Sequence, residues 1–162
     1  GSATVMEVAR TFAGLARRPK RSVVFVLFGG EELGLQGSTY FVDHVPAPFD
    51  KVVGMLNFDM TGEGDGLWGA APAEPAEFRK VIEEADKSVG VLRGLGVLRG
   101  VGVRGSDFAP FFVKGIPSAS FGSNGPHVAY HQTGDTIYRI NPDIMAEAAK
   151  LASLASYLWA DR

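Results

Sequence analysis

The chain of 162 residues contains no cysteine. Disulfide bonds, thiolate zinc sites and cysteine nucleophiles are therefore excluded together. Any metal site must instead use oxygen and imidazole ligands. The lack of cysteine leaves the compartment open, because many secreted proteins also lack this residue.

Charge bias and long apolar runs are missing as well. The formal net charge is −2, and acidic and basic residues are interspersed, so the sequence carries no basic patch for nucleic acid or for an anionic membrane. No apolar run approaches the roughly 20 residues needed to cross a bilayer, and the N-terminus lacks a basic-then-apolar signal pattern. We therefore expect neither a nucleic-acid partner nor a membrane partner.

The hydrophobic content of 46% in 162 residues is enough for one domain with a substantial core, and the chain is short for two. Helices are expected over residues 5–16, 36–45, 75–90 and 141–158, with a short helix between residues 106 and 115. Strands are expected over residues 22–28, 51–58, 67–68 and 116–121. Buried strands that alternate with helices predict an α/β fold, a three-layer α/β/α sandwich with a mostly parallel mixed sheet.

Three local expectations depend on cap and turn chemistry. Thr4 and Glu7 have the spacing of a capping box at the start of the first helix. Ser106 is placed to cap the short helix that Gly115 ends. Residues 92–103 form a glycine-rich near-repeat, which we interpret as a mobile loop or hairpin.

The most informative segment runs from Ser22 to Phe28 and continues through two glycines into Glu31 and Glu32. Its β-branched and aromatic residues are typical of a strand that is covered on both faces. Ligands of open α/β sheets collect at the carboxyl ends of such strands. Neighbouring residues point in different directions there, so one carboxylate could bind a metal while the other transfers a proton.

Two further polar groups follow predicted strands. Asp59 comes after the second strand, and His131 lies in the polar loop after the last one. Together with Glu31 and Glu32 they form a set of oxygen and imidazole groups suited to zinc. Each has a simpler explanation alone: a solvated helix start for the glutamates, a turn for Asp59 and an exposed loop for His131. Their joint placement at strand ends favours a metal site.

Other titratable side chains near these segments have structural interpretations. His44 lies at a helix end, where a cation is an ordinary stabiliser. His127 is four residues before His131, but glycine and proline neighbours favour a loop over a shared helical face. Asp107 is expected in the first turn of the short helix, and Asp135 either caps a turn or orients His131.

Four segments of the chain carry recognisable motifs: Phe28–Ser38, Asn57–Met60, Ser106–Phe111 and Tyr130–Thr136. Together and in this order they resemble the zinc aminopeptidases related to bacterial leucyl aminopeptidase, a superfamily that includes glutamate carboxypeptidase II. The resemblance covers nearly the whole chain, and the Glu-Glu segment is its most specific part. It implies a zinc-dependent metallopeptidase that hydrolyses N-terminal residues from peptides.

The resemblance also implies a role for each candidate residue. Glu31 would be the general base that takes a proton from the attacking water. Glu32 and His131 would bind a first zinc ion, and Asp59 would bind a second. The implied substrate is a peptide, and the family favours a secreted or periplasmic location.

The chain departs from the family pattern ahead of its first helix. Another zinc-binding histidine and a metal-bridging aspartate are expected there, and neither is present in the sequence. We therefore interpret residues 1–162 as the C-terminal portion of a zinc exopeptidase-like catalytic domain, incomplete at its N-terminus. Such a chain is expected to bind zinc weakly, to have little peptidase activity and to self-associate through an exposed sheet edge.

Two other functions stay open at this point. A one-zinc relative, such as an animal-type glutaminyl cyclase, would rearrange an N-terminal glutamine on the same scaffold. A non-catalytic peptidase-like binding module would have lost its ligands, and the retained glutamates, aspartate and histidine argue against it. The sequence does not give the preferred substrate side chain, because the side-chain pocket depends on loops such as residues 92–104. The choice of aminopeptidase over carboxypeptidase rests on the family resemblance alone.

Overall fold

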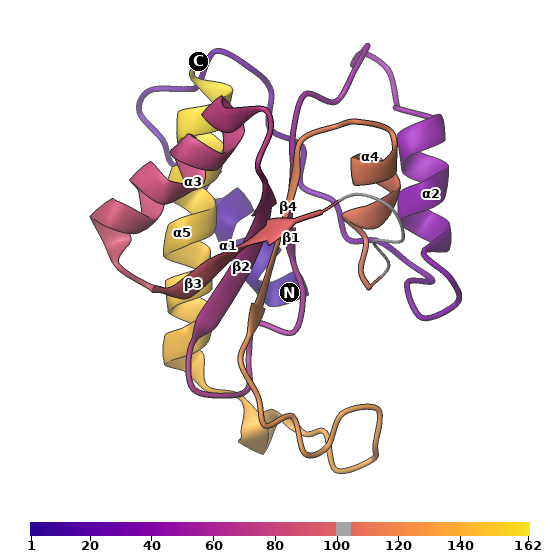
Figure 1. The fold of residues 1–162 in the computed structure, drawn as a ribbon, viewed down its shortest axis with the longest axis vertical. Coiled ribbons are helices and arrows are strands. Elements are labelled where there is room, and N and C mark those ends of the chain that lie inside the picture. The colour runs from indigo at the N-terminus through magenta and orange to yellow at the C-terminus, as the bar shows by residue number, and fades with distance from the viewer. Residues whose placement is uncertain (100–104) are drawn as a thin grey trace.

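The computed structural model describes residues 1–99 and 105–162 (Figure 1). Its helices are α1 (Ser2–Ala13), α2 (Gln36–Asp43), α3 (Ala76–Val89), α4 (Ala109–Val113) and α5 (Pro142–Ala160), with a short 3-10 helix η1 (Ile137–Arg139) before α5. Its strands are β1 (Met55–Phe58), β2 (Leu67–Pro72), β3 (Leu92–Leu98) and β4 (Ser118–Ser123). None of the described helices is both long enough and apolar enough to span a membrane.

The described strands form one mixed sheet in the order β1-β4-β2-β3. β1 runs parallel to β4, and β2 runs parallel to β3, while β2 and β4 are antiparallel. At the centre, Phe121 of β4 pairs with Phe58 of β1 on one side and with Gly69 of β2 on the other. The structure therefore confirms a mixed sheet that is mostly parallel, with β1 and β3 as its outer strands.

Helices cover both faces of this sheet (Figure 1). On one face, α5 contacts α1, α3, β1 and β2. On the other face, α2 and α4 pack together, and α4 contacts β4. This arrangement confirms the three-layer α/β/α sandwich predicted from the sequence.

The core lies between the sheet and one side of α5. Three small residues on that side, Ala148, Ala152 and Ala155, are buried and allow the helix to approach the strands closely. Phe78 of α3 is also buried, and its ring packs edge-to-face on Trp159 of α5 with the ring centroids 5.0 Å apart. Apolar packing of α3 and α5 therefore holds one helical layer on the sheet.

The segment 22–28 is extended but is not a strand of the sheet, so that prediction is wrong. Its residues form no backbone hydrogen bond with any described residue. Val24 and Leu27 are 45% and 54% exposed, whereas the sequence predicts a strand covered on both faces. An apolar, β-branched sequence indicates that a segment tends to be buried. A strand also requires a neighbouring backbone with which to pair.

Two other element predictions need correction. The strand expected over residues 51–58 forms only over its second half, as β1. Residues 92–98, expected as a loop or hairpin, form β3, and the end of that near-repeat lies outside the described residues. A Cβ at Gly94 would lie 2.6 Å from the ring of Trp68 on β2. The glycines therefore allow β3 to pair closely with β2 rather than marking a loop.

The capping box expected at Thr4 and Glu7 does not form. Because α1 begins at Ser2, Thr4 lies inside the helix, where its hydroxyl forms a buried hydrogen bond of 3.0 Å with the Thr61 hydroxyl. Glu7 instead forms a salt bridge with Arg10. The spacing that suggests a cap therefore also fits two residues within a helix.

Candidate active site

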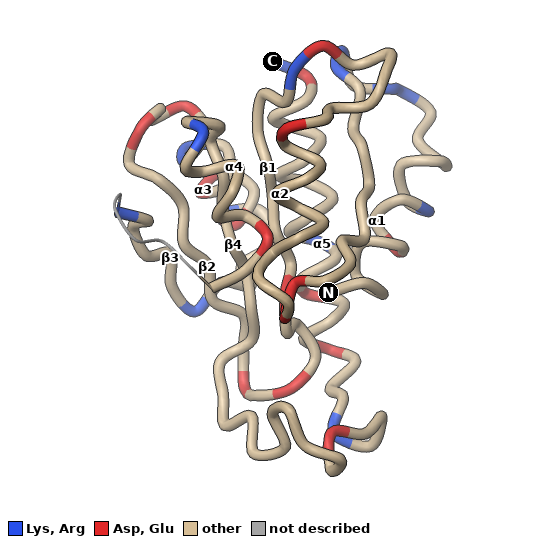
Figure 2. The backbone as a smooth tube through the Cα atoms, turned by 90° about the vertical axis from the view of Figure 1, so that its right-hand side faces the viewer, with Lys and Arg blue, Asp and Glu red and all other residues tan. Residues whose placement is uncertain are grey.

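Four segments of the chain bring polar side chains to the carboxyl end of β1. Glu31 and Glu32 lie between the extended segment and α2, and Asp59 directly follows β1. Asp107 precedes α4, and His131 lies in the loop between β4 and α5. Elsewhere, acidic and basic residues are both distributed along the whole molecule (Figure 2). The chemistry of this region therefore depends on a local arrangement rather than on a large charged surface.

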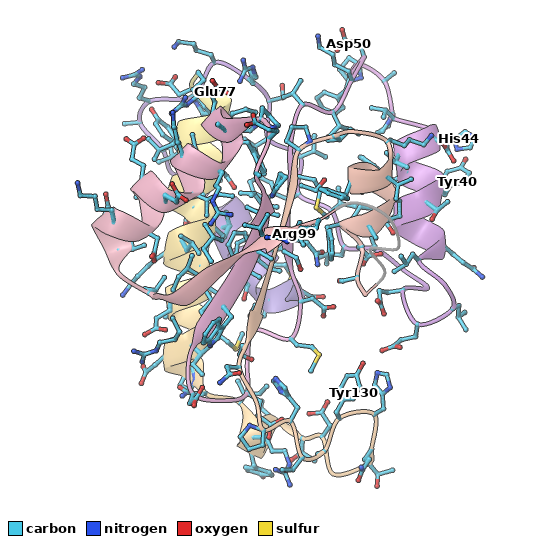
Figure 3. All side chains as sticks on the ribbon, in the orientation of Figure 1. Tyr40, His44, Asp50, Glu77, Arg99 and Tyr130 are labelled. Atoms are coloured by element: carbon cyan, nitrogen blue, oxygen red, sulfur yellow. The ribbon has the colours of Figure 1, made fainter. Side chains whose placement is uncertain are left out.

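Glu32 and His131 are 99 residues apart in the sequence but in contact in the structure. The Nε2 atom of His131 lies 2.6 Å from Oε1 of Glu32, and both side chains are exposed. Tyr130, on the loop at the bottom of Figure 3, stacks on the His131 ring with the centroids 3.8 Å apart. A carboxylate and an imidazole at this distance can turn towards a common cation. Their assignment as metal ligands stays a prediction.

Asp59 is held by a chain of hydrogen bonds. The Ser106 hydroxyl donates to Oδ2 of Asp59 at 2.8 Å, and the side-chain amide of Asn57 donates to the Ser106 hydroxyl at 2.8 Å. The backbone amide of Asp59 donates to the carbonyl of Phe121 on β4 at 3.0 Å. The sequence predicts a capping role for Ser106, but α4 has no side-chain cap. The Ser106 hydroxyl instead orients the Asp59 carboxylate.

Negative charge is concentrated around Glu31 and Asp107. Burial raises the pKa of Glu31, and three neighbouring carboxylates raise that pKa further. These are Glu32, Asp59 and Asp107. The charge of His131 acts in the opposite direction. Burial also raises the pKa of Asp107; a hydrogen bond with Ser38 acts in the opposite direction, and the charge of Asp59 raises the pKa further. Both carboxyl groups therefore bind a proton more readily than ordinary exposed ones.

Asp107 is a residue of this region that the sequence interpretation missed. It lies just ahead of α4 rather than in its first turn. Its Oδ1 atom is buried and has no hydrogen-bond partner among the described residues, which is uncommon for a carboxylate. A sequence signal existed, because Asp107 belongs to one of the four motifs that carry the family resemblance.

Three non-glycine residues near the site have a left-handed backbone conformation. Their φ angles are 59° for Leu35, 51° for Met60 and 56° for His131. Met60 directly follows Asp59. This conformation costs about 1 kcal/mol or more per residue, and such residues cluster at functional sites. The backbone strain therefore supports a functional role for this region.

The donor types at Glu32 and His131 suit zinc, because carboxylate oxygen and imidazole nitrogen are among its usual ligands. Within residues 1–99 and 105–162, however, no three histidine, aspartate or glutamate side chains are arranged to hold one ion. A catalytic zinc ion normally has three protein ligands. The described residues therefore form no complete zinc site, and Asp59 is held separately by Ser106.

The other two histidines, His44 and His127, form local contacts. These contacts agree with the structural roles expected for them from the sequence. Nδ1 of His44 lies 2.9 Å from the carbonyl oxygen of Tyr40, and the two rings stack. Figure 3 shows this pair on the outer side of α2. Nε2 of His127 lies 3.0 Å from the carbonyl oxygen of Ser123, and its Nδ1 lies 3.8 Å from Glu63.

Comparison with known sequences identifies relatives along the whole chain. A model described as Peptidase family M28 matches residues 1–156. Leupeptin-inactivating enzyme 1 of Streptomyces exfoliatus is 37% identical over 119 residues, which cover 72% of this chain and 26% of that protein. Aminopeptidase YwaD of Bacillus subtilis (strain 168) is 28% identical over 167 residues, which cover 97% of this chain and 36% of that protein. The chain spans well under half the length of either relative.

Comparison with solved structures gives the same picture for the fold. LapA of Legionella pneumophila matches with a TM-score of 0.84 and 25% identity, covering 100% of this chain and 47% of that one. BSAP, described as a zinc aminopeptidase from Bacillus subtilis, matches with a TM-score of 0.77 and 26% identity, covering 96% of this chain and 39% of that one. The sandwich described above is therefore shared with parts of these larger proteins.

Proposed function

Because this chain belongs to peptidase family M28, we propose that it carries part of the active site of a zinc-dependent aminopeptidase. The names of YwaD and BSAP describe aminopeptidases, and that of BSAP includes zinc. The observation that carries the proposal is the 2.6 Å contact between Glu32 and His131, beside the carboxylates of Glu31 and Asp59. The proposed reaction is hydrolysis of the first peptide bond of a peptide.

In this proposal, Glu31 is the general base. Its carboxylate takes a proton from water as the water oxygen attacks the peptide carbonyl. It then returns the proton to the nitrogen of the leaving amine as the C–N bond breaks. The products are the free N-terminal amino acid and the shortened peptide. The position of Glu31 next to Glu32, in a half-buried environment, supports this division of roles.

Glu32 and His131 would hold one zinc ion, and Asp59 would hold a second. Zinc, when bound, lowers the pKa of water and polarises the substrate carbonyl. Ser106 and Asn57 would keep the Asp59 carboxylate oriented through the hydrogen bonds described above. The short Glu32–His131 distance and the oxygen and nitrogen donors support this assignment, and the number of ions is part of the proposal.

The proposed function can be tested on the longest natural polypeptide that contains this chain. We expect hydrolysis of leucine p-nitroanilide and of a peptide with a free N-terminus, but not of the same peptide with an acetylated N-terminus. Activity should disappear after chelation and return with added zinc, because the metal supplies part of the catalysis. If a peptide that begins with glutamine were cyclised and none were hydrolysed, a glutaminyl cyclase would be the better description.

Residues 1–162 alone are expected to bind zinc weakly, because two contacting ligands fall short of the three that catalytic zinc normally has. Isothermal titration calorimetry measures this affinity directly. The variant Glu32→Gln should weaken the remaining binding, whereas Glu31→Gln should leave it unchanged, since of these two glutamates only Glu32 is assigned as a zinc ligand. Two sites with submicromolar affinity in the unsubstituted chain would contradict the prediction.

A further inference from the structure

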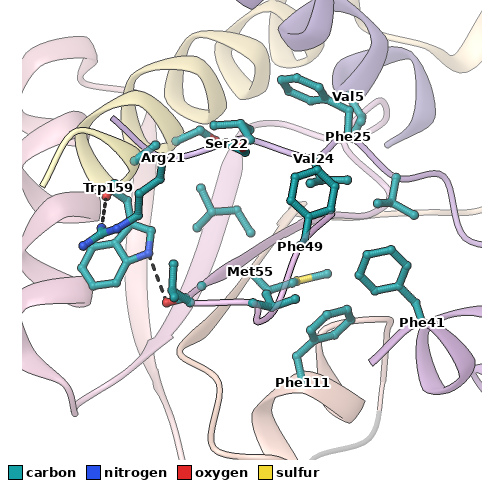
Figure 4. A pocket seen from close by; sticks show the side chains of 18 of the residues that line it. Val5, Arg21, Ser22, Val24, Phe25, Phe41, Phe49, Met55, Phe111 and Trp159 are labelled. Carbon is teal, nitrogen blue, oxygen red and sulfur yellow. Dashed lines mark hydrogen bonds between the residues drawn. The ribbon is translucent and has the colours of Figure 1, made fainter. Parts of the chain in front are cut away.

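The loop that carries His131 has little apolar support. We call residues 124–136 the His131 loop, and Figure 1 shows it extending away from the sheet and the helical layers. Ala129 is buried, but every residue from His131 to Ile140 is exposed. The apolar pocket beside segment 22–28 (Figure 4) is lined by none of the loop residues, all of which the structure describes. The position of His131 therefore depends mainly on polar contacts.

The backbone conformation at His131 requires such support. Its φ angle of 56° lies in the left-handed region, which is uncommon for a residue with a side chain. Residues in this conformation persist only where the surrounding structure fixes them. The 2.6 Å contact with Glu32 holds the imidazole ring of His131. Other contacts are needed to hold the backbone of the loop.

The segment that follows β1, residues 59–66, holds both ends of the loop. At the start of the loop, the Asn124 amide donates to the Gly66 carbonyl at 2.8 Å. Beyond its end, the Asn141 amide donates to the Gly62 carbonyl at 2.7 Å. These backbone contacts fix where the loop begins and ends, and the residues between them need contacts of their own.

Glu63, in the middle of the segment after β1, contacts the chain on both sides of His131. Its Oε1 atom lies 3.5 Å from Nη1 of Arg139, and its Oε2 atom lies 3.8 Å from Nδ1 of His127. The Arg139 guanidinium also donates through Nε to the Gly134 carbonyl at 2.9 Å. One carboxylate therefore holds the chain four residues before His131 and, through a guanidinium, three residues after it.

The contacts of Glu63 are partly shielded from solvent. The side chains of Glu63 and His127 are 19% and 20% exposed, and that of Arg139 is 38% exposed. Salt screens such ion pairs less than it screens fully exposed ones. Nε2 of His127 donates to the Ser123 carbonyl at 3.0 Å, so Nδ1 attracts Glu63 only when the ring is protonated. The contact with Arg139 has no such condition and is the main one.

We propose that Glu63 is a positioning residue for His131. Its carboxylate orders the His131 loop through Arg139, and through His127 when that ring is protonated. Asp59 lies on the same segment as Glu63, so one segment supports both of the assigned metal positions. The role of His131 as a zinc ligand rests on the proposed function, whereas the ordering of the loop does not depend on it.

Millisecond hydrogen–deuterium exchange of residues 1–162 without metal tests the ordering of the loop. The amides of Tyr130, Gln132 and Asp135 donate to carbonyls within the loop. In Glu63→Gln these amides should exchange at least about threefold faster, because the loop opens more often once its ion pairs are lost. Glutamine keeps the length of the side chain and removes only its charge.

The variant Glu83→Gln is the matched control. It removes the same charge from the 2.8 Å salt bridge with Arg79 on α3, so the loop amides should exchange as in the unsubstituted chain. Arg139→Gln should speed exchange as Glu63→Gln does. The double variant of Glu63 and Arg139 should differ little from either single variant, because both substitutions remove the same contact. Arg139→Lys keeps the charge and should retain part of the protection.

Zinc binding tests the effect on His131. In the longest natural polypeptide that contains this chain, Glu63→Gln should raise the Kd for zinc at least about threefold, because His131 is less often in place. At limiting zinc, kcat for leucine p-nitroanilide should fall while KM changes little. Excess zinc should restore kcat, since His131, once bound to zinc, no longer depends on the ion pairs for its position. A loss of kcat through a damaged fold would not be restored in this way.

Three results would overturn the inference. Equal exchange rates in Glu63→Gln and Glu83→Gln would show that Glu63 does not order the loop. Additive effects of Glu63→Gln and Arg139→Gln would show that the two residues do not act through one contact. Faster exchange with an unchanged Kd for zinc would show that the ordering does not serve His131. A polypeptide that neither binds zinc nor hydrolyses peptides would contradict the proposed function instead, and exchange would still decide whether Glu63 orders the loop.

Discussion

The variant Glu31→Gln is expected to lower kcat for leucine p-nitroanilide by about 10²- to 10⁴-fold, the usual contribution of a general base. Glutamine keeps the size and shape of the side chain, but its amide cannot take a proton from water. KM should change little, because Glu31 is assigned to proton transfer and not to substrate binding. Steady-state kinetics on the longest natural polypeptide that contains this chain provide the measurement.

Measuring the zinc content of the same variants distinguishes the roles of Glu31 and Glu32. Glu31→Gln should retain the zinc of the unsubstituted protein, whereas Glu32→Gln should lose both zinc and activity. High concentrations of added zinc should restore part of the activity of Glu32→Gln and none of that of Glu31→Gln. If Glu31→Gln lost its zinc, or kept more than about a tenth of kcat, Glu31 would not be the general base.

The meeting of Glu32 and His131 shows what the sequence could predict about the site. Each belongs to a motif that follows an apolar segment predicted to be a strand, and the parallel strands of an α/β sheet collect ligands at their carboxyl ends. The order of the motifs therefore predicts that the Glu32 and His131 side chains lie near each other. It does not predict the distance between His131 Nε2 and Glu32 Oε1, which is 2.6 Å in the structure. Their chemical roles stay predictions, because a contact between two side chains does not identify a bound metal.

Other features of the site depend on contacts that no local pattern encodes. Ser106 has the residue type and position of a helix cap, yet its hydroxyl binds Asp59, which lies 47 residues earlier in the chain. Segment 22–28 has the composition of a buried strand, yet composition does not reveal whether a neighbouring backbone is present. From the sequence, the glycines of β3 predict a loop. In the structure, the ring of Trp68 lies against Gly94, where a side chain would not fit.

Replacing Phe121 by alanine is expected to lower the free energy of unfolding by about 3–5 kcal/mol. Phe121 lies in β4, between β1 and β2, and its side chain is 1% exposed. Its ring stacks on that of Phe58 with the centroids 4.8 Å apart, so the substitution removes an aromatic pair as well as buried surface. A domain stable by about 5–15 kcal/mol would lose a large share of its stability. Urea unfolding should show a lower midpoint with an unchanged slope.

The exposed Tyr138→Ala serves as the control for removal of an aromatic ring. Tyr138 is 95% exposed, so its loss should change stability by no more than about 0.5 kcal/mol. The neighbour Gly69 provides a second test, because a Cβ there would lie 2.7 Å from the Phe121 ring. Gly69→Ala should therefore destabilise the unsubstituted chain but cost less in the Phe121→Ala background, where the ring is gone. Additive effects would show that the strands move apart to accommodate the methyl group, and that the ring does not fix their spacing.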